Sequence, residues 1–317
     1  MPTPTQKRCV GIDVSKHHWD VATTDNRHVR RFDANQAGLA LLLAWLDTQQ
    51  PTLVCLEATG GYEALLVEGL HQQGLPTAVL NPRRVRDFAR ATGQLAKTDA
   101  IDAAVLARFA AAVDPTPTEP PSDRQRRLKT LRARRQQVQQ TLTQEKNRLG
   151  VARDEETREW VRRSIGFLQE QLGEIDQRLA EATQEDPEFR RRHQLLVSVP
   201  GVGPTTANGL IAELPELGSM NRGQAAKLVG LAPLNRDSGV LRGKRRIGGG
   251  RSAVRRSLYM ATLVATRHNP LIRRHYQHLL QRGKAKMTAL VACMRKLLLI
   301  LNAIVKKQTP WKNTLPD

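Results

Sequence analysis

The sequence predicts an α/β domain at the amino terminus followed by helical segments, a fold class of α/β plus α. Short runs of β-favouring residues alternate with helix-forming segments before residue 114, whereas heptad-spaced apolar residues dominate after residue 122. The 317 residues also carry a net charge of +20 that is concentrated near the carboxyl terminus. Together with a proline-rich boundary at 114–122, these features predict domains at 1–114, 115–190 and 191–317.

The amino-terminal domain is expected to open with three antiparallel strands. The first covers the sequence RCVGIDVSK, residues 8–16, and places Asp13 near its end. Residues 17–24 and 27–32 favour two further strands joined by a short turn. A fourth, apolar strand over residues 52–56 is followed directly by Glu57.

Helices are expected to alternate with the remaining strands of this domain. Asn35 can cap a helix that extends to Gln49, a second helix is expected over 62–73, and residues 76–80 favour a fifth strand. The resulting order, β-β-β-α-β-α-β followed by helices, is that of a ribonuclease H-like fold.

Four acids come from three separate elements of this predicted domain. Asp13 and Glu57 end strands, and Asp99 and Asp102 are spaced i and i+3, on one face of a predicted helix. Converging carboxylates repel one another unless a cation lies between them, and hard oxygen ligands suit Mg²⁺ or Mn²⁺. They therefore predict a metal site for phosphoryl transfer; the alternative is that each acid is an ordinary capping or surface residue.

Basic residues between the fifth strand and the acid pair include Arg83, Arg84 and Lys97. A phosphate backbone that approached the metal site would pass them, although a solvated helix face explains them equally well.

The middle segment is expected to form two long helices. Their heptad positions hold Leu128, Leu131, Val138, Leu142 and Leu149 in the first helix and Val161, Ile165, Leu168, Leu172, Ile175 and Leu179 in the second. This pattern favours a helical hairpin or a coiled coil that joins subunits. Residues 123–153 carry 10 basic and 2 acidic side chains and residues 154–190 carry 5 and 11, so the helices can pair with each other or with a second subunit. The basic helix can alternatively lie on nucleic acid.

The carboxyl-terminal domain carries almost all of the excess positive charge. Residues 191–317 contain 23 basic and 4 acidic side chains, against 12 and 12 in residues 1–114. Such a field indicates a polyanionic partner, most simply nucleic acid. Gly201 and Gly203 lie in a VPGVGP turn that resembles a helix-hairpin-helix, whose backbone amides can bind phosphates.

A serine lies next to a cluster of cations in the same domain. Ser238 precedes a glycine, and the cations that follow it are Arg242, Lys244, Arg245, Arg246, Arg251, Arg255 and Arg256. Such a serine can act as a nucleophile on a phosphodiester whose charge the cations stabilise. The alternative is an ordinary turn serine.

Cysteine usage and hydropathy exclude several other classes. Cys9, Cys55 and Cys293 are far apart in apolar segments, so we expect reduced core thiols and no zinc site. No apolar run approaches the ~18 residues of a membrane span, and the amino terminus has no apolar signal core. We therefore expect a cytoplasmic protein.

Several motifs together resemble one family. The motifs GIDVSK at 11–16, LEATG at 56–60, KTDAIDA at 97–103, PGVGPTTA at 200–207 and DSG at 237–239 are similar to those of the DEDD insertion-sequence transposases. That family includes bridge-RNA-guided recombinases and related DNA invertases, and the similarity covers nearly the whole chain.

The resemblance implies a RuvC-like domain with an acidic tetrad at Asp13, Glu57, Asp99 and Asp102, and a transposase domain with Ser238 as nucleophile. It further implies Mg²⁺, a tetramer, and an element-encoded guide (bridge) RNA that pairs with both donor and target DNA. We expect a homodimer or homotetramer that is associated with a prokaryotic nucleoid. Two other classes stay open on sequence alone. A RuvC-like Holliday-junction nuclease would use the same acids with water as nucleophile, and a non-catalytic scaffold would leave the acids unexplained.

Overall fold

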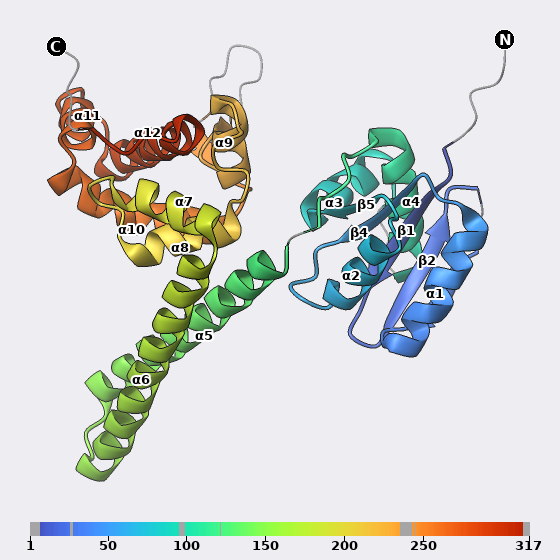
Figure 1. Ribbon diagram of the computed structural model, residues 1–317, viewed down its shortest axis with the longest axis horizontal. Helices are drawn as coiled ribbons and strands as arrows, with labels where there is room; N and C mark the ends of the chain where they lie inside the picture. Colours follow the sequence, from blue (N-terminus) through green and yellow to red (C-terminus); the bar gives the residue numbers. More distant parts are fainter. Residues whose placement is uncertain are drawn as a thin grey trace. The chain divides into compact units, whose positions relative to one another are not determined.

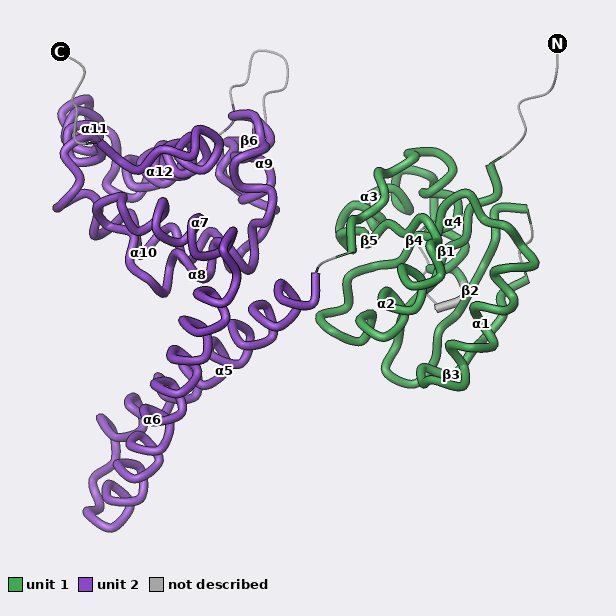
Figure 2. Tube along the Cα trace, in the orientation of Figure 1, with its two compact units in different colours: residues 1–121 green, residues 122–317 purple. Residues whose placement is uncertain are grey.

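A computed structural model describes residues 7–25, 28–94, 99–120, 122–234, 243 and 245–312, without the side chains of 99 and 100. The chain divides into two compact units, Met1–Pro121 and Ser122–Asp317 (Figure 2). The first unit contains a mixed five-stranded sheet, and the second is almost entirely helical.

The sheet of the first unit has the strand order β3-β2-β1-β4-β5. Strands β1 (Cys9–Val14), β2 (His18–Thr23) and β3 (Arg30–Asp33) form an antiparallel meander, and β4 (Leu53–Glu57) and β5 (Thr77–Leu80) add to β1 in parallel. The five predicted strands are confirmed, each within three residues of the expected ends.

Helices cover both faces of this sheet (Figure 1). Helices α1 (Gln36–Gln49) and α2 (Ala64–Gln72) pack on the face formed by the even-numbered residues of β1, around the fully buried Trp19. Helices α3 (Pro82–Ala91) and α4 (Asp99–Val113) pack on the opposite face.

The Asn35 side chain accepts a hydrogen bond from the amide of Gly38 and caps α1, as predicted. Since β1 alternates between the two cores, Cys9, Gly11 and Asp13 share the face that α3 and α4 cover.

The second unit begins with a long antiparallel hairpin. It consists of α5 (Asp123–Val151) and α6 (Glu155–Glu185), and the chain then continues into α7 (Pro187–Val197), α8 (Pro204–Glu213) and α9 (Arg222–Val229). Leu128 and Leu179, near the open end of the hairpin, belong to the same hydrophobic core as the carboxyl-terminal helices. The hairpin is thus continuous with the helical unit.

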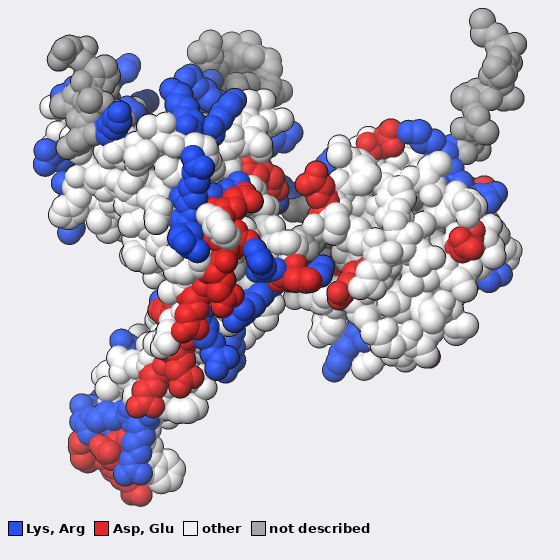
Figure 3. All heavy atoms as spheres, viewed as in Figure 1, with Lys and Arg blue, Asp and Glu red and all other residues white. Residues whose placement is uncertain are grey.

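The predicted heptad residues of α5 and α6 pack against each other within one chain. Val138, Leu142 and Leu172 are buried together, with Leu168 partly buried beside them. Opposite charges pair across the same hairpin. The Nε and Nη2 atoms of Arg135 donate to Asp176 at 2.6 and 2.8 Å, Arg124 reaches Asp186 at 2.8 Å, and Arg127 reaches Glu185 at 3.2 Å. Figure 3 shows acidic side chains running along α6 with basic ones beside them. Of the alternatives for this segment, the structure therefore shows the intramolecular hairpin.

The rest of the second unit consists of a short two-stranded sheet and three helices. Strands β6 (Pro233–Leu234) and β7 (Arg246–Ile247) pair antiparallel, and α10 (Ser252–His268), α11 (Pro270–Gln281) and α12 (Lys286–Lys307) follow. Helices α10 and α12 both contribute buried residues to the core of this unit.

Helix α12 corrects one expectation from the sequence. The helix has 22 residues, and its most apolar stretch has a mean hydropathy of 1.9. By length and composition alone, such a helix could cross a membrane. The apolarity has a structural reason: 56% of that stretch is buried inside the protein, and Cys293, Leu297 and Leu301 lie at the centre of the helical core. It is a core helix of this unit.

Candidate active site

The two predicted strand-end acids occupy neighbouring positions in the sheet. Ile12 of β1 is in register with Leu56 of β4, so the next residues along these parallel strands, Asp13 and Glu57, lie side by side on the same face. Adjacent strands are about 4.8 Å apart, so the backbones at Asp13 and Glu57 are about one strand spacing from each other. The sheet thereby brings together two of the four acids that the sequence singled out.

Helix α4 runs antiparallel to β1 on that face, which directs its amino terminus toward Asp13. Lys7, just before β1, donates to Asp114, just after α4, at 2.6 Å. Further along β1, a Cβ atom on Gly11 would overlap the backbone of Ala103 and Ala107. Residues further along β1 therefore lie next to residues that come earlier in α4.

Gly11 is required at this crossing because no side chain fits between strand and helix. Asp13 lies two residues beyond Gly11 on the same face of β1. The part of α4 nearest to Asp13 is therefore the helix segment just before Ala103. Asp102 immediately precedes Ala103 and therefore belongs to the amino-terminal end of α4, which is the end directed toward Asp13.

The fourth predicted acid, Asp99, is the first residue of α4, and its side chain lies outside the described residues. Within the part of the chain that the structure describes, no group of three His, Cys, Asp or Glu side chains is close enough together to hold a metal ion. The donors that are described, Asp13, Glu57 and Asp102, are all carboxylates, which is the ligand type that Mg²⁺ and Mn²⁺ prefer.

A fifth acid lies in the same row of the sheet and was missed from the sequence. Asp20 of β2 is directly opposite Asp13, and Arg31 of β3 is directly opposite Asp20. Directly paired residues point to the same face. We call the row Arg31–Asp20–Asp13–Glu57 the charged rung. The three-residue turn at 15–17 sets this register. The length of this turn was the sequence feature from which the position of Asp20 opposite Asp13 could have been inferred.

The predicted nucleic-acid contacts of the first unit lie on α3. Arg83 and Arg84 are both exposed, Arg83 forms an ion pair with Asp87 at 3.8 Å, and the Arg84 guanidinium lies 5.6 Å from the centre of the Phe109 ring. Lys97 falls outside the described residues.

The glycine turn between α7 and α8 is explained largely by packing. Gly201 has a φ of +100°, and a Cβ atom there would come within 2.6 Å of the Cβ of Ala265 on α10. Gly203 forms the amino-terminal cap position of α8 and is exposed, with open space around it. Of the two glycines, only Gly203 lies on an open surface.

Ser238, Arg242 and Lys244 lie outside the described residues, but the segments that flank them are described. β6 and β7 pair on either side of this stretch, and Gly250 comes so close to Gly230 and Leu228 that neither glycine could carry a side chain. The two ends of the serine-containing segment are therefore held together.

Two of the predicted phosphate-binding arginines instead bind within the protein. Arg251 donates two hydrogen bonds of 2.6 Å to the Glu216 carboxylate. Partial burial acts to raise the pKa of Glu216, but the hydrogen bonds and the charge of Arg251 outweigh it, so the pKa is lowered. Arg255 donates to the carbonyl oxygens of Val229 and Gly249 at 3.0 and 2.7 Å. Arg245, Arg246 and Arg256 are exposed.

A partly buried arginine links the hairpin to the helical core. The Arg132 side chain on α5 donates to Ser257 of α10 at 2.8 Å and lies 3.5 Å from Glu213 of α8. A Cβ atom on Gly209 would meet this guanidinium at 2.7 Å. Burial lowers the Arg132 pKa, and the nearby Glu213 partly opposes that effect.

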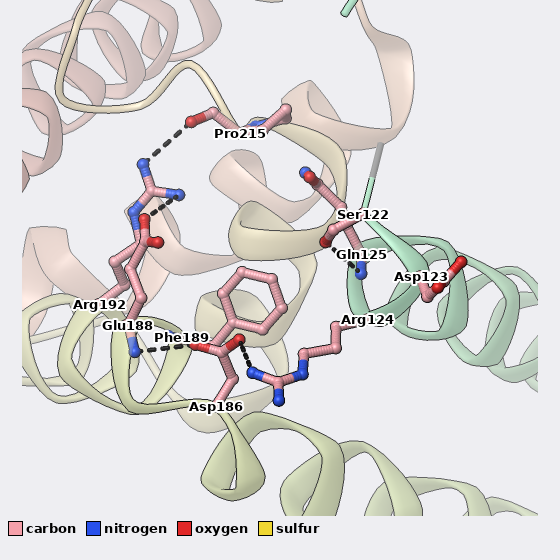
Figure 4. A pocket seen from close by; sticks show the side chains of 9 residues that line it. All are labelled: Ser122, Asp123, Arg124, Gln125, Asp186, Glu188, Phe189, Arg192 and Pro215. Carbon is pink, nitrogen blue, oxygen red and sulfur yellow. Dashed lines mark hydrogen bonds and ion pairs between the residues drawn. The ribbon is translucent and has the colours of Figure 1, made fainter. Parts of the chain in front are cut away.

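A surface pocket of about 620 Å³ lies where α5 begins and α6 meets α7 (Figure 4). Its lining includes both signs of charge, with Arg124 bound to Asp186 and Arg192 bound to the Pro215 carbonyl oxygen at 3.0 Å. None of the residues that the sequence predicted as catalytic lines it.

Two family models match this chain. A family model for DEDD transposases of the IS110 group, described as "Transposase", matches residues 10–152, and one described as "Transposase IS116/IS110/IS902 family" matches residues 193–277. The pilin gene-inverting protein of Moraxella lacunata is 28% identical over 321 aligned positions, which cover 98% of this chain and 99% of the relative. That of Moraxella bovis is 27% identical with the same coverage. The chain belongs to the IS110 family of transposases and DNA invertases, which are DNA recombination enzymes.

Proposed function

We propose that this recombinase cuts and rejoins DNA strands with a divalent cation held by Asp13, Glu57, Asp99 and Asp102 and with Ser238 as the nucleophile. The observation that carries the proposal is the placement of Asp13 beside Glu57 on one face of the sheet, with the amino-terminal end of α4, which bears Asp99 and Asp102, directed toward the same edge. The strand order β3-β2-β1-β4-β5, with β1, β4 and β5 parallel, supports a ribonuclease H-like fold for this unit.

The donor set supports Mg²⁺ or Mn²⁺ as the cation. When bound, such an ion would polarise the phosphodiester and offset the charge that develops on its oxygens. The protein's own contribution is to hold several carboxylates at one edge of a rigid sheet. Repulsion between Asp13 and Glu57 at one strand spacing favours a cation there.

The serine is proposed to attack the scissile phosphorus, so that a bond from its Oγ to phosphorus forms as a bond from phosphorus to a deoxyribose oxygen breaks. The leaving oxygen takes a proton, and the Ser238 hydroxyl loses one. The phosphoserine link retains the phosphodiester, and a new strand end can reverse the step without ATP. Exposed cations next to this segment, Arg245 and Arg246, support the stabilisation of phosphate charge.

Donor and target DNA, and an element-encoded guide RNA, are the proposed partners. The relatives are named for inverting a pilin gene, which is a rearrangement of DNA. After Asp237 the sequence contains no acidic residue before Asp317, so the helices α10 to α12 carry basic charges only. A surface of this kind binds phosphate backbones without reading sequence, and pairing with a guide RNA would supply the specificity.

Assembly into a dimer or tetramer is proposed to use the outer face of α6. Trp160 and Phe167 are 65% and 59% exposed although both are large and apolar. They are spaced by two helical turns and therefore lie on one face, away from the α5 contact made by Leu168 and Leu172. Exposed aromatic residues in such a row are typical of a protein–protein contact.

The experiment that tests the metal site uses Asp13→Asn in the full chain. We expect cleavage of a DNA substrate in Mg²⁺ to fall by at least about 10³-fold, because one charged ligand is lost from the site. Circular dichroism should show an unchanged fold, and Asp47→Asn, a carboxylate on α1, is the matched control. Wild-type cleavage by Asp13→Asn would contradict the proposed site.

A further inference from the structure

The charged rung contains an ion pair, between Arg31 and Asp20, that lies outside the proposed acidic tetrad. We propose that Asp20 and Arg31 form a positioning pair that sets the divalent-cation affinity of the site at Asp13 and Glu57, an inference that rests on the proposed function. Asp20 is opposite Asp13 on β2, and Arg31 is opposite Asp20 on β3, so the pair extends the same row of the sheet.

The geometry of the pair is bidentate. The Nε and Nη2 atoms of Arg31 donate to Oδ1 and Oδ2 of Asp20, both at 2.8 Å. Two parallel hydrogen bonds fix the plane of the carboxylate as well as its position. Asp20 is only 2% exposed, so its charge lies in an environment that screens it weakly.

A histidine from the same strand adds a third contact. The Nε2 atom of His18 lies 3.6 Å from Oδ2 of Asp20, and His18 is two residues before Asp20, so both point to the same face of β2. The Asp20 carboxylate is thus hydrogen-bonded from β3, and His18 of its own strand lies beside it.

The two charges of the pair have opposite effects on a cation beside Asp13. Asp20 places a third carboxylate one strand spacing from Asp13, which attracts a divalent cation, whereas Arg31 opposes that attraction from one strand further away. The pair therefore allows a buried acid next to the site without leaving its charge unbalanced. Removing either partner should shift cation affinity, and the two shifts should have opposite signs.

This difference in sign separates the proposal from a merely structural ion pair. If Asp20 and Arg31 only stabilised the sheet, removing either one would loosen the same strands and weaken cation binding in the same direction. Charge setting instead predicts tighter binding without Arg31 and weaker binding without Asp20.

The test is calorimetric titration of Mn²⁺ into the full-length protein without DNA, which requires no catalysis. We expect Arg31→Gln to lower the Mn²⁺ dissociation constant about three- to ten-fold and Asp20→Asn to raise it by at least the same factor. The double variant should have a Mn²⁺ dissociation constant within about two-fold of the wild-type value. Arg31→Lys keeps the charge, so its dissociation constant should also be within about two-fold of wild type.

Arg8→Gln is the matched control. It removes one cation from the same unit, at the opposite end of β1, where Arg8 pairs with the exposed Asp25 at 2.9 Å. Its Mn²⁺ affinity should equal that of wild type. Should Asp20→Asn fail to fold, the comparison of Arg31→Gln with Arg31→Lys still tests the charge effect.

Unchanged or weaker Mn²⁺ binding in folded Arg31→Gln would overturn the inference. Failure of the underlying metal site is recognised separately, through Asp13→Asn. If Asp13→Asn binds Mn²⁺ as wild type does, the proposed function is wrong. If Asp13→Asn loses Mn²⁺ binding but the Asp20 and Arg31 variants keep the wild-type Mn²⁺ affinity, only the positioning pair is rejected.

Discussion

At the scale of single residues, Gly11 determines how closely α4 packs on β1. Helix α4 crosses β1 at this position so closely that a methyl group would overlap the backbone of Ala103 and Ala107. Backbone atoms cannot move aside as a flexible side chain can, so the cost falls on the packing of the whole helix.

We predict that Gly11→Ala destabilises the first unit by about 3 kcal/mol or more and also weakens cation binding, because α4 carries Asp99 and Asp102. Thermal unfolding followed by circular dichroism would measure the loss. Gly74→Ala is a useful comparison, since a Cβ atom there meets no neighbour, although its left-handed φ of +72° adds some strain. An equally small effect at both glycines would contradict the crossing described here.

Single residues also show what the sequence could and could not predict. Asp13 and Glu57 were predicted because each follows a run of β-favouring residues, and the parallel register of β1 and β4 is consistent with that pattern. Asp20 was missed because its importance comes from which residue lies opposite it. The residue opposite Asp20 depends on the length of the turn at 15–17. Residue propensities do not predict the length of a turn to within one residue.

At the scale of elements, the hairpin of α5 and α6 shows how one pattern can support two structures. The heptads predicted both a hairpin and an intermolecular coiled coil, since both bury the same positions. The ion pairs of Arg135 with Asp176 and of Arg124 with Asp186 are consistent with the first. The solvent-facing aromatic residues could not be identified from the heptads, because they lie outside them.

We predict that Phe167→Glu reduces assembly while leaving the hairpin folded, because Phe167 faces solvent in the single chain. Leu172→Glu should instead lower the free energy of unfolding of the hairpin by about 2–5 kcal/mol, because Leu172 is buried against α5. Light scattering reports the mass of each variant and circular dichroism its helicity. A wild-type protein that is monomeric when bound to nucleic acid would refute the assembly surface.

At the scale of the whole molecule, charge is divided between the two units. Residues 1–121 carry 12 basic and 13 acidic side chains, and residues 122–317 carry 38 and 17. Because the root of the hairpin shares a core with the carboxyl-terminal helices, a cut at residue 121 preserves that core, whereas a cut at residue 190 would expose it.

We predict that residues 122–317 bind duplex DNA with nearly the affinity of the full chain, and that residues 1–121 bind it weakly. Binding should fall by about 10³- to 10⁵-fold between 50 and 200 mM salt if six to ten phosphates are contacted, as counterion release requires. Fluorescence anisotropy over a salt series measures the slope. A shallow slope for 122–317 would show that its basic surface is not the main DNA contact.

The central claim, that Ser238 attacks DNA, is tested most directly by trapping the reaction on a nicked substrate that releases the end needed for rejoining. The account predicts that protein remains covalently attached to the cleaved DNA end through a phosphoserine, which mass spectrometry of the digested adduct would assign to Ser238. Ser238→Ala should give neither adduct nor strand exchange, and Ser219→Ala, an exposed serine in the same unit, should behave as wild type. Free DNA ends from the wild-type protein, or undiminished strand exchange by Ser238→Ala, would contradict the claim and indicate a nuclease that uses water as its nucleophile.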